Sequence, residues 1–538
     1  MYLRTTSRKN QDGSSTAYLQ IAENVWDPIQ KRSTVKVLCT LGRADGKAVD
    51  RLQQLARSIR KNAPWESIAE LEEGWTFVNS WKHGPFAAIN HLWKQAGLEK
   101  IIEQAVKKED RTVPFERAIF AMVANRCLEP SSKLDCYERW MSEEVYFPEG
   151  KAIALHHLYR AMDFLSAHKK EIEEEIYWQT ADLLNMDVDL IFYDTTSVSF
   201  EIDWEDDEGL RKRGYSKEGR PDAPQIVVGM VVTRDGYPVK TWVFPGNTAD
   251  VTTISRVKSD LKGWRLNRCV FVADAGMVSE NNLRELSKGG GRYIVAMPCR
   301  KGTEVVEDVL SRPGRFKIVA DNLQVKEVWV GEGVRRRRYV VCFNPLEAER
   351  QKKHREEVLR ELEAEIASLR GHPKKSCRLL SSRRFGPYLR TLKSGELRIS
   401  CGSVRARAKR DGLWVIHSND EELSAEDLAL AYKQLMRVEE AWRTMKSTIR
   451  IDPVYHRKTE RIEAHVFLCS LALLLERIAE KACGLTWKRI REELRTIKVG
   501  QLLSPHGTVY QASPGSMKAR NLLKKMGMES LPSILNAE

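Results

Sequence analysis

Residues 190–194 read Leu-Ile-Phe-Tyr-Asp, and residues 270–276 read Val-Phe-Val-Ala-Asp-Ala-Gly. Each run has the length and apolar content of a buried β-strand, and each reaches a carboxylate, at Asp194 and at Asp274. A carboxylate at the end of a buried strand is costly unless a positive group meets it. Divalent cations such as Mg²⁺ prefer oxygen ligands of this kind. The two runs therefore predict strands whose aspartates converge on one metal site.

A third carboxylate, Glu439, lies in a helical pattern that we expect to run from Ser424 to about residue 448. Tyr432, Glu439 and Lys446 are spaced by seven residues, nearly two helical turns, so an unbroken helix places them on one face. Glu440 competes with Glu439, but it lies about 100° away around the helix. An ordinary surface helix with local charge pairs would show the same spacing. Glu439 is the expected third ligand for a pair of metal ions.

Between residues 187 and 300, strand-like runs alternate with helical ones, which predicts an α/β layer. The expected strands are 189–193, 225–233, 238–244, 269–273 and 293–297, and the expected helices are 250–262 and 280–287. Asp250 fits the N-terminus of the first helix as a capping residue. From about 85 to 185 the apolar period is helical, and Ser132 is a candidate helix cap there.

Changes of pattern divide the 538 residues into six expected parts. They are a small β module with a helix at 47–62 within residues 1–80, a helical region at 81–186, the first part of a core at 187–300, a basic β-rich insertion at 301–410, the second part of the core with the Glu439 helix at 411–480, and a helical tail at 481–538.

The chain is strongly basic, with 88 Lys and Arg against 74 Asp and Glu, a net charge of +14. This excess favours a polyanionic partner, DNA or RNA, although a basic but indifferent surface remains the alternative. Ten scattered Cys form no Cys-x-x-Cys pair, which argues against a zinc ribbon and indicates reduced thiols. No signal core or membrane span is recognised. We expect a cytoplasmic protein without a membrane partner.

Several basic and aromatic residues are candidate DNA contacts. The four consecutive arginines at residues 335–338 could bind DNA, or they could form a solvated turn between strands. Trp414 could stack on a flipped base, although a tryptophan at a strand start more often joins the core. Arg437 and Arg443 lie beside Glu439 and could contact phosphate. This arginine run consists of Arg335, Arg336, Arg337 and Arg338.

The order Asp, Asp, Glu, with an insertion before the Glu, resembles bacterial insertion-sequence transposases with a ribonuclease-H-like core. Many of these carry a Tyr-x2-Arg-x3-Glu-x6-Lys signature, which Tyr432, Glu439 and Lys446 match, while Leu435 stands in the Arg slot. The resemblance covers about residues 100–480, and the first 80 residues resemble, more loosely, an N-terminal domain that binds transposon ends. Further similar stretches are Tyr193-Asp194-Thr195-Thr196, Gly214-Tyr215-Ser216-Lys217, Pro245-Gly246-Asn247-Thr248, Ala273-Asp274-Ala275-Gly276-Met277 and Arg461-Ile462-Glu463-Ala464-His465.

This resemblance implies a ribonuclease-H-like catalytic core in which Asp194, Asp274 and Glu439 hold Mg²⁺, with Mn²⁺ as a substitute. It implies nicking at transposon ends, followed by attack of the freed 3′-hydroxyl on target DNA. The implied partners are double-stranded DNA and a second copy of the chain, at the bacterial nucleoid. Two alternatives stay open: a metal-dependent nuclease without strand transfer, and an inactive DNA-binding descendant of a transposase. The sequence leaves the terminal repeats, the target preference and the use of a hairpin intermediate undetermined.

Overall fold

The computed structural model describes residues 2–9, 15–27, 32–44, 75–108, 113–184, 189–262, 264, 269–299, 305–333, 336–368, 373–504, 507–529 and 531–537. These residues form two compact units. The first comprises Met1–Asn79, Gly500–Gln511 and Ile534–Glu538, and the second comprises Ser80–Val499 and Ala512–Ser533. Within the described ranges, no helix is long and apolar enough to cross a membrane.

The N-terminal module contains a three-stranded antiparallel sheet, which confirms the expected small β structure. Its strands are β1 (Tyr2–Lys9), β2 (Ser15–Asp27) and β3 (Arg32–Arg43), in the order β1-β2-β3. The helix expected at 47–62 lies outside the described residues.

The C-terminal tail is not purely helical, which corrects the expectation for residues 481–538. Three of its segments form a four-stranded sheet with β4 (Thr76–Lys82), in the order β18-β17-β16-β4. The alternation of apolar and polar residues in these tail segments is too short to predict strands from the sequence. These segments are β16 (Lys498–Ser504), β17 (Gly507–Ala512) and β18 (Ile534–Ala537), and the tail helices are α17 (Trp487–Leu494) and α18 (Met517–Lys525).

A nine-stranded mixed sheet forms the centre of the second unit, with the order β10-β11-β12-β15-β9-β8-β5-β6-β7. Strand β8 runs parallel to both of its neighbours, β5 and β9. The other pairs in this sheet are antiparallel. The strands are β5 (Leu190–Ser199), β6 (Gln225–Thr233), β7 (Pro238–Pro245), β8 (Val270–Ala273), β9 (Arg292–Met297), β10 (Lys317–Ala320), β11 (Leu323–Val330), β12 (Arg337–Phe343) and β15 (Leu413–Ser418).

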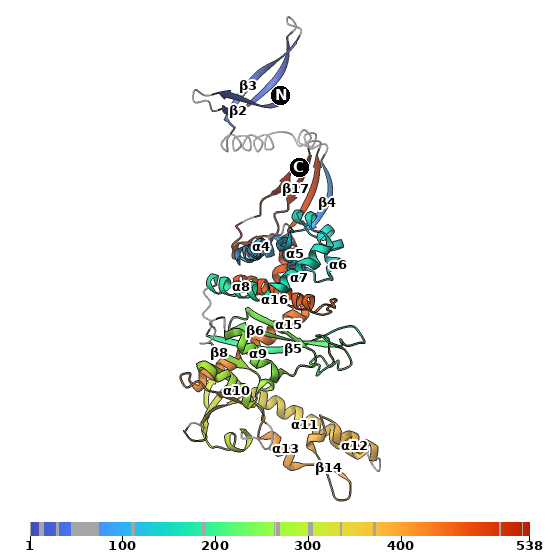
Figure 1. The fold of residues 1–538 in the computed structure, drawn as a ribbon, viewed down its shortest axis with the longest axis vertical. Helices are drawn as coiled ribbons and strands as arrows, with labels where there is room; N and C mark the ends of the chain where they lie inside the picture. Colours follow the sequence, from blue (N-terminus) through green and yellow to red (C-terminus); the bar gives the residue numbers. More distant parts are fainter. Residues whose placement is uncertain are drawn as a thin grey trace. The chain divides into compact units, whose positions relative to one another are not determined.

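Helices cover both faces of this sheet (Figure 1). On one face, α9 (Asp250–Lys262) and α10 (Glu280–Ser287) pack against Ile191, Tyr193 and their neighbours. The other face meets α14 (Ala425–Lys433), α15 (Met436–Ser447) and the long α16 (Thr459–Cys483). The strands and helices predicted between 189 and 297 are present, but β5 continues past the expected end at residue 193 to Ser199, so Asp194 lies within the strand and not at its end. The protein is a mixed α/β structure with a large sheet.

The expected β-rich insertion at 301–410 does not form a β domain of its own. Strands β10, β11 and β12 extend the central sheet, because β12 pairs directly with β15. The basic stretch that follows is mainly helical, with only the short hairpin β13–β14 (Leu389–Thr391 and Leu397–Ile399). The remaining elements of this part are η6 (Val305–Val309), α11 (Pro345–Ser368), α12 (Pro373–Ser381), η8 (Gly386–Tyr388) and α13 (Cys401–Ala408).

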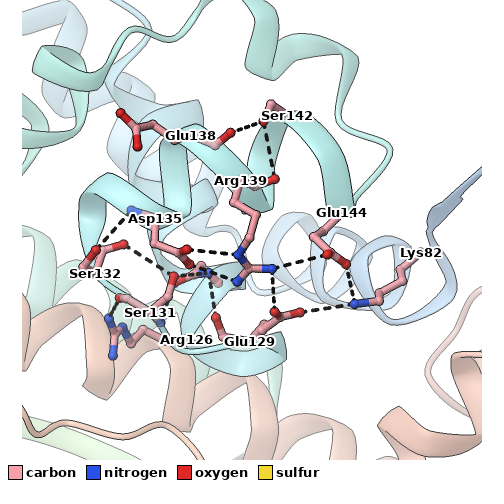
Figure 2. Close-up of polar contacts among 11 residues, drawn as sticks. Lys82, Arg126, Glu129, Ser131, Ser132, Asp135, Glu138, Arg139, Ser142 and Glu144 are labelled. Carbon is pink, nitrogen blue, oxygen red and sulfur yellow. Dashed lines mark hydrogen bonds and ion pairs between the residues drawn. The ribbon is translucent and has the colours of Figure 1, made fainter.

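The predicted helical region at 81–186 is confirmed, and Ser132 caps α6 by accepting a hydrogen bond from the Asp135 backbone at 3.1 Å. Figure 2 shows the ion pairs that follow this cap. Arg139 contacts Glu129 at 2.8 Å and Asp135 at 2.9 Å. The elements of the region are α3 (Gly84–Gln95), α4 (Leu98–Lys108), α5 (Phe115–Leu128), α6 (Lys133–Asp135), η1 (Cys136–Glu144), η2 (Pro148–Ala152), α7 (Leu155–Ala167) and α8 (Lys169–Leu183).

Lys133, at the start of α6, is an unusual member of this helical core because its side chain is only 4% exposed. Burial, together with the nearby charge of Arg126, lowers the pKa of its ammonium to about 7. A buried ammonium destabilises the fold unless it is neutralised.

Lys133→Met is expected to raise the free energy of unfolding by about 1–2 kcal/mol near pH 6.5, because an apolar side chain replaces the buried ammonium. The folded pKa is lowered, so the cost of the charge is fully present below about pH 7 and fades as the pH rises toward 10.5. Denaturant unfolding at about pH 6.5 and pH 9.5 should therefore show that Lys133→Met raises the free energy of unfolding over the parent by less at the higher pH. Lys100→Met, at an exposed position of α4, is the control and should change stability by less than about 0.5 kcal/mol. A gain that does not depend on pH would contradict the role of the charge.

Candidate active site

Asp194 and Asp274 lie at corresponding positions of two adjacent parallel strands. The register pairs Tyr193 of β5 with Ala273 of β8, and each aspartate is the next residue along the chain. Neighbouring strands are about 4.8 Å apart, so the backbones of the two aspartates lie side by side. Because side chains alternate, both aspartates share the sheet face of Phe192, on which α14 and α15 pack.

The carboxyl group of Asp194 is poorly compensated. Burial raises its pKa to about 6, while the ammonium of Lys217 opposes this shift and the carboxylates of Asp250 and Asp274 add to it. The closest cation, Nζ of Lys217, is 3.9 Å from the Asp194 carboxylate. A partly buried carboxylate with two acidic neighbours and one distant lysine is an environment that favours the arrival of further positive charge.

Lys217 and Asp250 form a second layer around Asp194 that the sequence did not reveal. Lys217 Nζ lies 3.0 Å from the Asp250 carboxylate and donates hydrogen bonds to the Thr195 backbone oxygen and hydroxyl, at 2.8 and 2.7 Å. The Thr195 hydroxyl in turn donates to Asp250 at 2.6 Å. Asp250 does begin α9, as expected, but its side chain faces this network. The only sequence signal was the similarity of the Gly214–Lys217 stretch to transposases.

The helix expected from Ser424 to about 448 is interrupted, so Tyr432 does not share a helix with Glu439. It lies on α14, which ends at Lys433, and α15 begins at Met436. Tyr432 still points to the site, since its hydroxyl donates a hydrogen bond to Asp274 at 3.2 Å. Burial raises the pKa of Tyr432, and the negative charges of Asp274 and Glu439 raise it further. Tyr432 thus lies close to both carboxylates.

Glu439 and Lys446 share one face of α15 but point to different partners. Glu439 is exposed, and Lys446 forms an ion pair with Glu218 at 2.8 Å. Arg443 is exposed as well, while Arg437 pairs with the competing carboxylate Glu440 at 3.2 Å. In the part of the chain that the structure describes, no three His, Cys, Asp or Glu side chains gather closely enough to hold a metal ion. Glu439 is therefore near the two aspartates without meeting them.

Leu435, which stands in the signature's Arg slot, belongs to the core. It is 7% exposed and packs with Leu428 and Val438 at the junction of α14 and α15. The leucine at this position offers no phosphate contact.

The arginine run does not form one DNA-gripping surface. Arg338 is 6% exposed and is bound by Glu327 at 2.8 Å and the Asp420 backbone oxygen at 2.6 Å, which corrects its assignment as a DNA contact. Arg337 pairs with Glu280 at 2.9 Å. Arg336 is exposed and lies over the Trp329 ring at 4.1 Å. Arg335 lies outside the described residues.

Trp414 belongs to the central sheet, which corrects its assignment as a base-stacking residue. It lies on β15 opposite Cys342 of β12 and packs against the main hydrophobic core. Its ring is partly buried there, which favours the alternative of a core tryptophan.

The residues around Asp194 suit divalent metal ions of the hard type. Two carboxylates from adjacent strands, with a third on the facing helix, offer only oxygen donors, as Mg²⁺ prefers. Burial raises the pKa of Asp194, and Lys217 Nζ, 3.9 Å from its carboxylate, offsets this only in part, so the site can accept further positive charge. The residues present therefore fit a magnesium-type site in donor chemistry.

Two families of known proteins match the chain. The model of the transposase DDE domain matches residues 195–475, more than half of the chain, and begins directly after Asp194. The model of the IS1634 family transposase N-terminal domain matches residues 3–67. No curated protein matches. Among solved structures, a cryo-EM structure of the piggyBac transposase synaptic complex with hairpin DNA is similar, with 11% identity, a TM-score of 0.33, and coverage of 77% of this chain and 79% of that chain.

Proposed function

The chain belongs to the family of transposases with a DDE domain, and from this premise we propose that it cleaves transposon ends and joins their 3′-hydroxyls to target DNA. The placement of Asp194 and Asp274 carries the proposal. Asp194 lies within β5 and Asp274 directly follows the adjacent parallel strand β8, on the face that meets α14 and α15, and Tyr432 donates a hydrogen bond to Asp274. We further propose that the central sheet is the ribonuclease-H-like core of this enzyme.

In the proposed reaction, Asp194 and Asp274 would hold metal ions from the sheet, and Glu439 would complete the set from α15 if its exposed side chain turned toward them. A pair of Mg²⁺ ions, or Mn²⁺ in their place, would activate the attacking oxygen and stabilise the leaving one. Tyr432 orients the Asp274 carboxylate through its hydrogen bond. Lys446, on the same helix as Glu439, holds a backbone phosphate as a point charge.

The N-terminal sheet is our proposed second DNA surface. The register places Arg4 opposite Gln20, and Gln20 opposite Thr40, on one face. A hydrogen bond of 3.3 Å between the Gln20 amide and the Thr40 hydroxyl confirms that these side chains lie together. Arg8 and Arg43 belong to the same face, so it combines positive charge with groups suited to base edges. Strands can read DNA in this way.

We propose that two copies of the chain act together on DNA at the bacterial nucleoid. A transposon has two ends, each of which must be cut and joined. One copy of the carboxylate set serves one end at a time. A homodimer would present two sites with related geometry.

Strand transfer separates the proposal from its alternatives. A duplex carrying the inverted repeat that flanks the reading frame, labelled at a free 3′-hydroxyl end, would be incubated with the full-length chain, supercoiled plasmid and Mg²⁺. We expect the label to become covalently joined to the plasmid. Cleavage without joined product would support a plain nuclease, and binding without either product would support an inactive DNA-binding descendant.

A further inference from the structure

The ion pair between Lys446 and Glu218 occupies the place where the proposed function needs a DNA phosphate. One oxygen of the Glu218 carboxylate lies 2.8 Å from Lys446 Nζ, and the other accepts a hydrogen bond from the Ser199 hydroxyl at 2.8 Å. The Glu218 and Lys446 side chains are 20% and 28% exposed, so the pair is partly withdrawn from water. A carboxylate bound in this way presents to Lys446 a single negative charge and hydrogen-bond-accepting oxygens, as a backbone phosphate does.

The residue before Glu218 has the opposite charge and faces the opposite partners. Lys217 Nζ lies 3.0 Å from Asp250 and 3.9 Å from Asp194, beside the proposed metal ligands. Two consecutive residues therefore neutralise opposite charges in the candidate site. Lys217 places an ammonium beside the carboxylates of Asp194 and Asp250, and Glu218 places a carboxylate beside the ammonium of Lys446.

Hydroxyl groups hold these two residues against β5. The Ser197 hydroxyl accepts from the Lys217 backbone at 3.3 Å, and the Ser216 hydroxyl accepts from the Glu218 backbone at 3.3 Å. Gly219 follows with a left-handed φ of 74° and no atom within 4 Å of an added Cβ. Tyr215 before them is 78% exposed. The Gln225 side chain also donates to the Tyr215 backbone oxygen at 3.1 Å. Hydrogen bonds of this kind contribute only about 1 kcal/mol each, so a DNA phosphate and a bound cation together can compensate for their loss.

We propose that the segment Tyr215–Gly219 is an internal plug of the active site, in which Glu218 stands in for a DNA phosphate and Lys217 stands in for a cation. The inference rests on the proposed function. DNA displaces Glu218 from Lys446, and because Lys217 is the adjacent residue, the same displacement draws its ammonium away from Asp194 and Asp250. DNA binding and cation binding thereby favour each other.

Glu218→Gln tests the phosphate half of the plug. The full-length variant is titrated into a fluorescent 30-base-pair duplex of arbitrary sequence in EDTA, so that no cleavage occurs. We expect about fivefold tighter binding than the parent, because Lys446 becomes available to a phosphate. The salt dependence should also steepen by about 0.9 in its log–log slope, the contribution of one new phosphate contact.

Glu201→Gln is the matched control. Glu201 lies two residues after Ser199, pairs with Arg220 on the surface and is 67% exposed, so its removal changes the net charge by the same amount without affecting Lys446. Glu218→Gln binding no more tightly than Glu201→Gln, or more weakly than the parent, would overturn the proposal. Weaker binding would mean that Glu218 positions Lys446 for DNA. A parent that does not bind the duplex at all would count against the proposed function itself.

Lys217→Met tests the cation half without measuring activity. Without Lys217, the carboxylates of Asp194 and Asp250 repel each other, so added Mg²⁺ should stabilise this variant more than the parent. We expect 10 mM Mg²⁺ to raise its melting temperature by about 2–4 °C more than that of the parent. Lys212→Met, which alters a lysine bound to the Asp207 backbone oxygen, should behave as the parent does. Equal Mg²⁺ shifts in the parent and Lys217→Met would overturn this half.

Discussion

Asp194→Ala is expected to lower the rate of transposon-end cleavage in Mg²⁺ by more than about a thousandfold while leaving DNA affinity nearly unchanged. A metal ligand acts on the transition state of phosphoryl transfer, whereas DNA is bound by separate basic groups. The variant should fold, since the buried Asp194 carboxyl has a raised pKa and stabilises neither neighbouring carboxylate. Asp274→Ala and Glu439→Ala should lose activity to a similar degree.

Asp203→Ala is the matched control for this series. Asp203 is exposed in the loop that follows β5. Asp203→Ala therefore removes an aspartate carboxylate close in sequence to Asp194 but on the surface. Cleavage should remain within about twofold of the parental rate, as for a surface change away from any site. Near-parental cleavage by any one of the three active-site variants would show that the residue is not a ligand. Duplex anisotropy measured in parallel separates loss of chemistry from loss of binding.

Leu435→Arg is expected to lower the free energy of unfolding by about 3–5 kcal/mol, although it restores the residue that the family signature carries at this position. Leu435 is 7% exposed between Leu428 and Val438, and no carboxylate is hydrogen-bonded there to receive a guanidinium. Burying an unpaired charge is among the costliest single changes. Denaturant unfolding of the full-length chain provides the measurement.

Met436→Arg provides the comparison at the next residue. Met436 is 53% exposed at the start of α15, and arginine there should change stability by less than about 0.5 kcal/mol. If Leu435→Arg were as stable as Met436→Arg, the side chain at 435 would have to reach solvent. The junction of α14 and α15 would then differ from the one described above.

The strands that carry Asp194 and Asp274 could be predicted from the sequence because their signal is local. An apolar run of four or five residues that ends in a charge indicates a buried strand wherever its neighbours lie. The local sequence of a strand does not show which other strand it pairs with. Strands β10, β11 and β12 show the same alternation whether they form a separate insertion or extend the central sheet, and only the pairing of β12 with β15 decides between them.

The parts of the site that were missed depend on tertiary contacts. Spacing alone cannot show that the chain overwinds for two residues between Lys433 and Met436, which separates Tyr432 from the Glu439 helix. Nothing in the local sequence distinguishes the buried Arg338 from the exposed Arg336, since the partners of Arg338 are Glu327 and Asp420. Lys217 likewise becomes informative only when its loop is placed beside Asp250.

The order of these elements along the chain has a consequence for synthesis on the ribosome. Asp194 and Asp274 leave the ribosome long before Glu439, and α16, which packs on α5, α7 and β7, follows later still. Chains grow at about 5–20 residues per second and fold from the N-terminus onwards. A nascent or prematurely terminated chain therefore carries two of the three carboxylates without the helices that cover them. On the proposed function, in which Glu439 completes the metal site, such incomplete copies could not cut DNA.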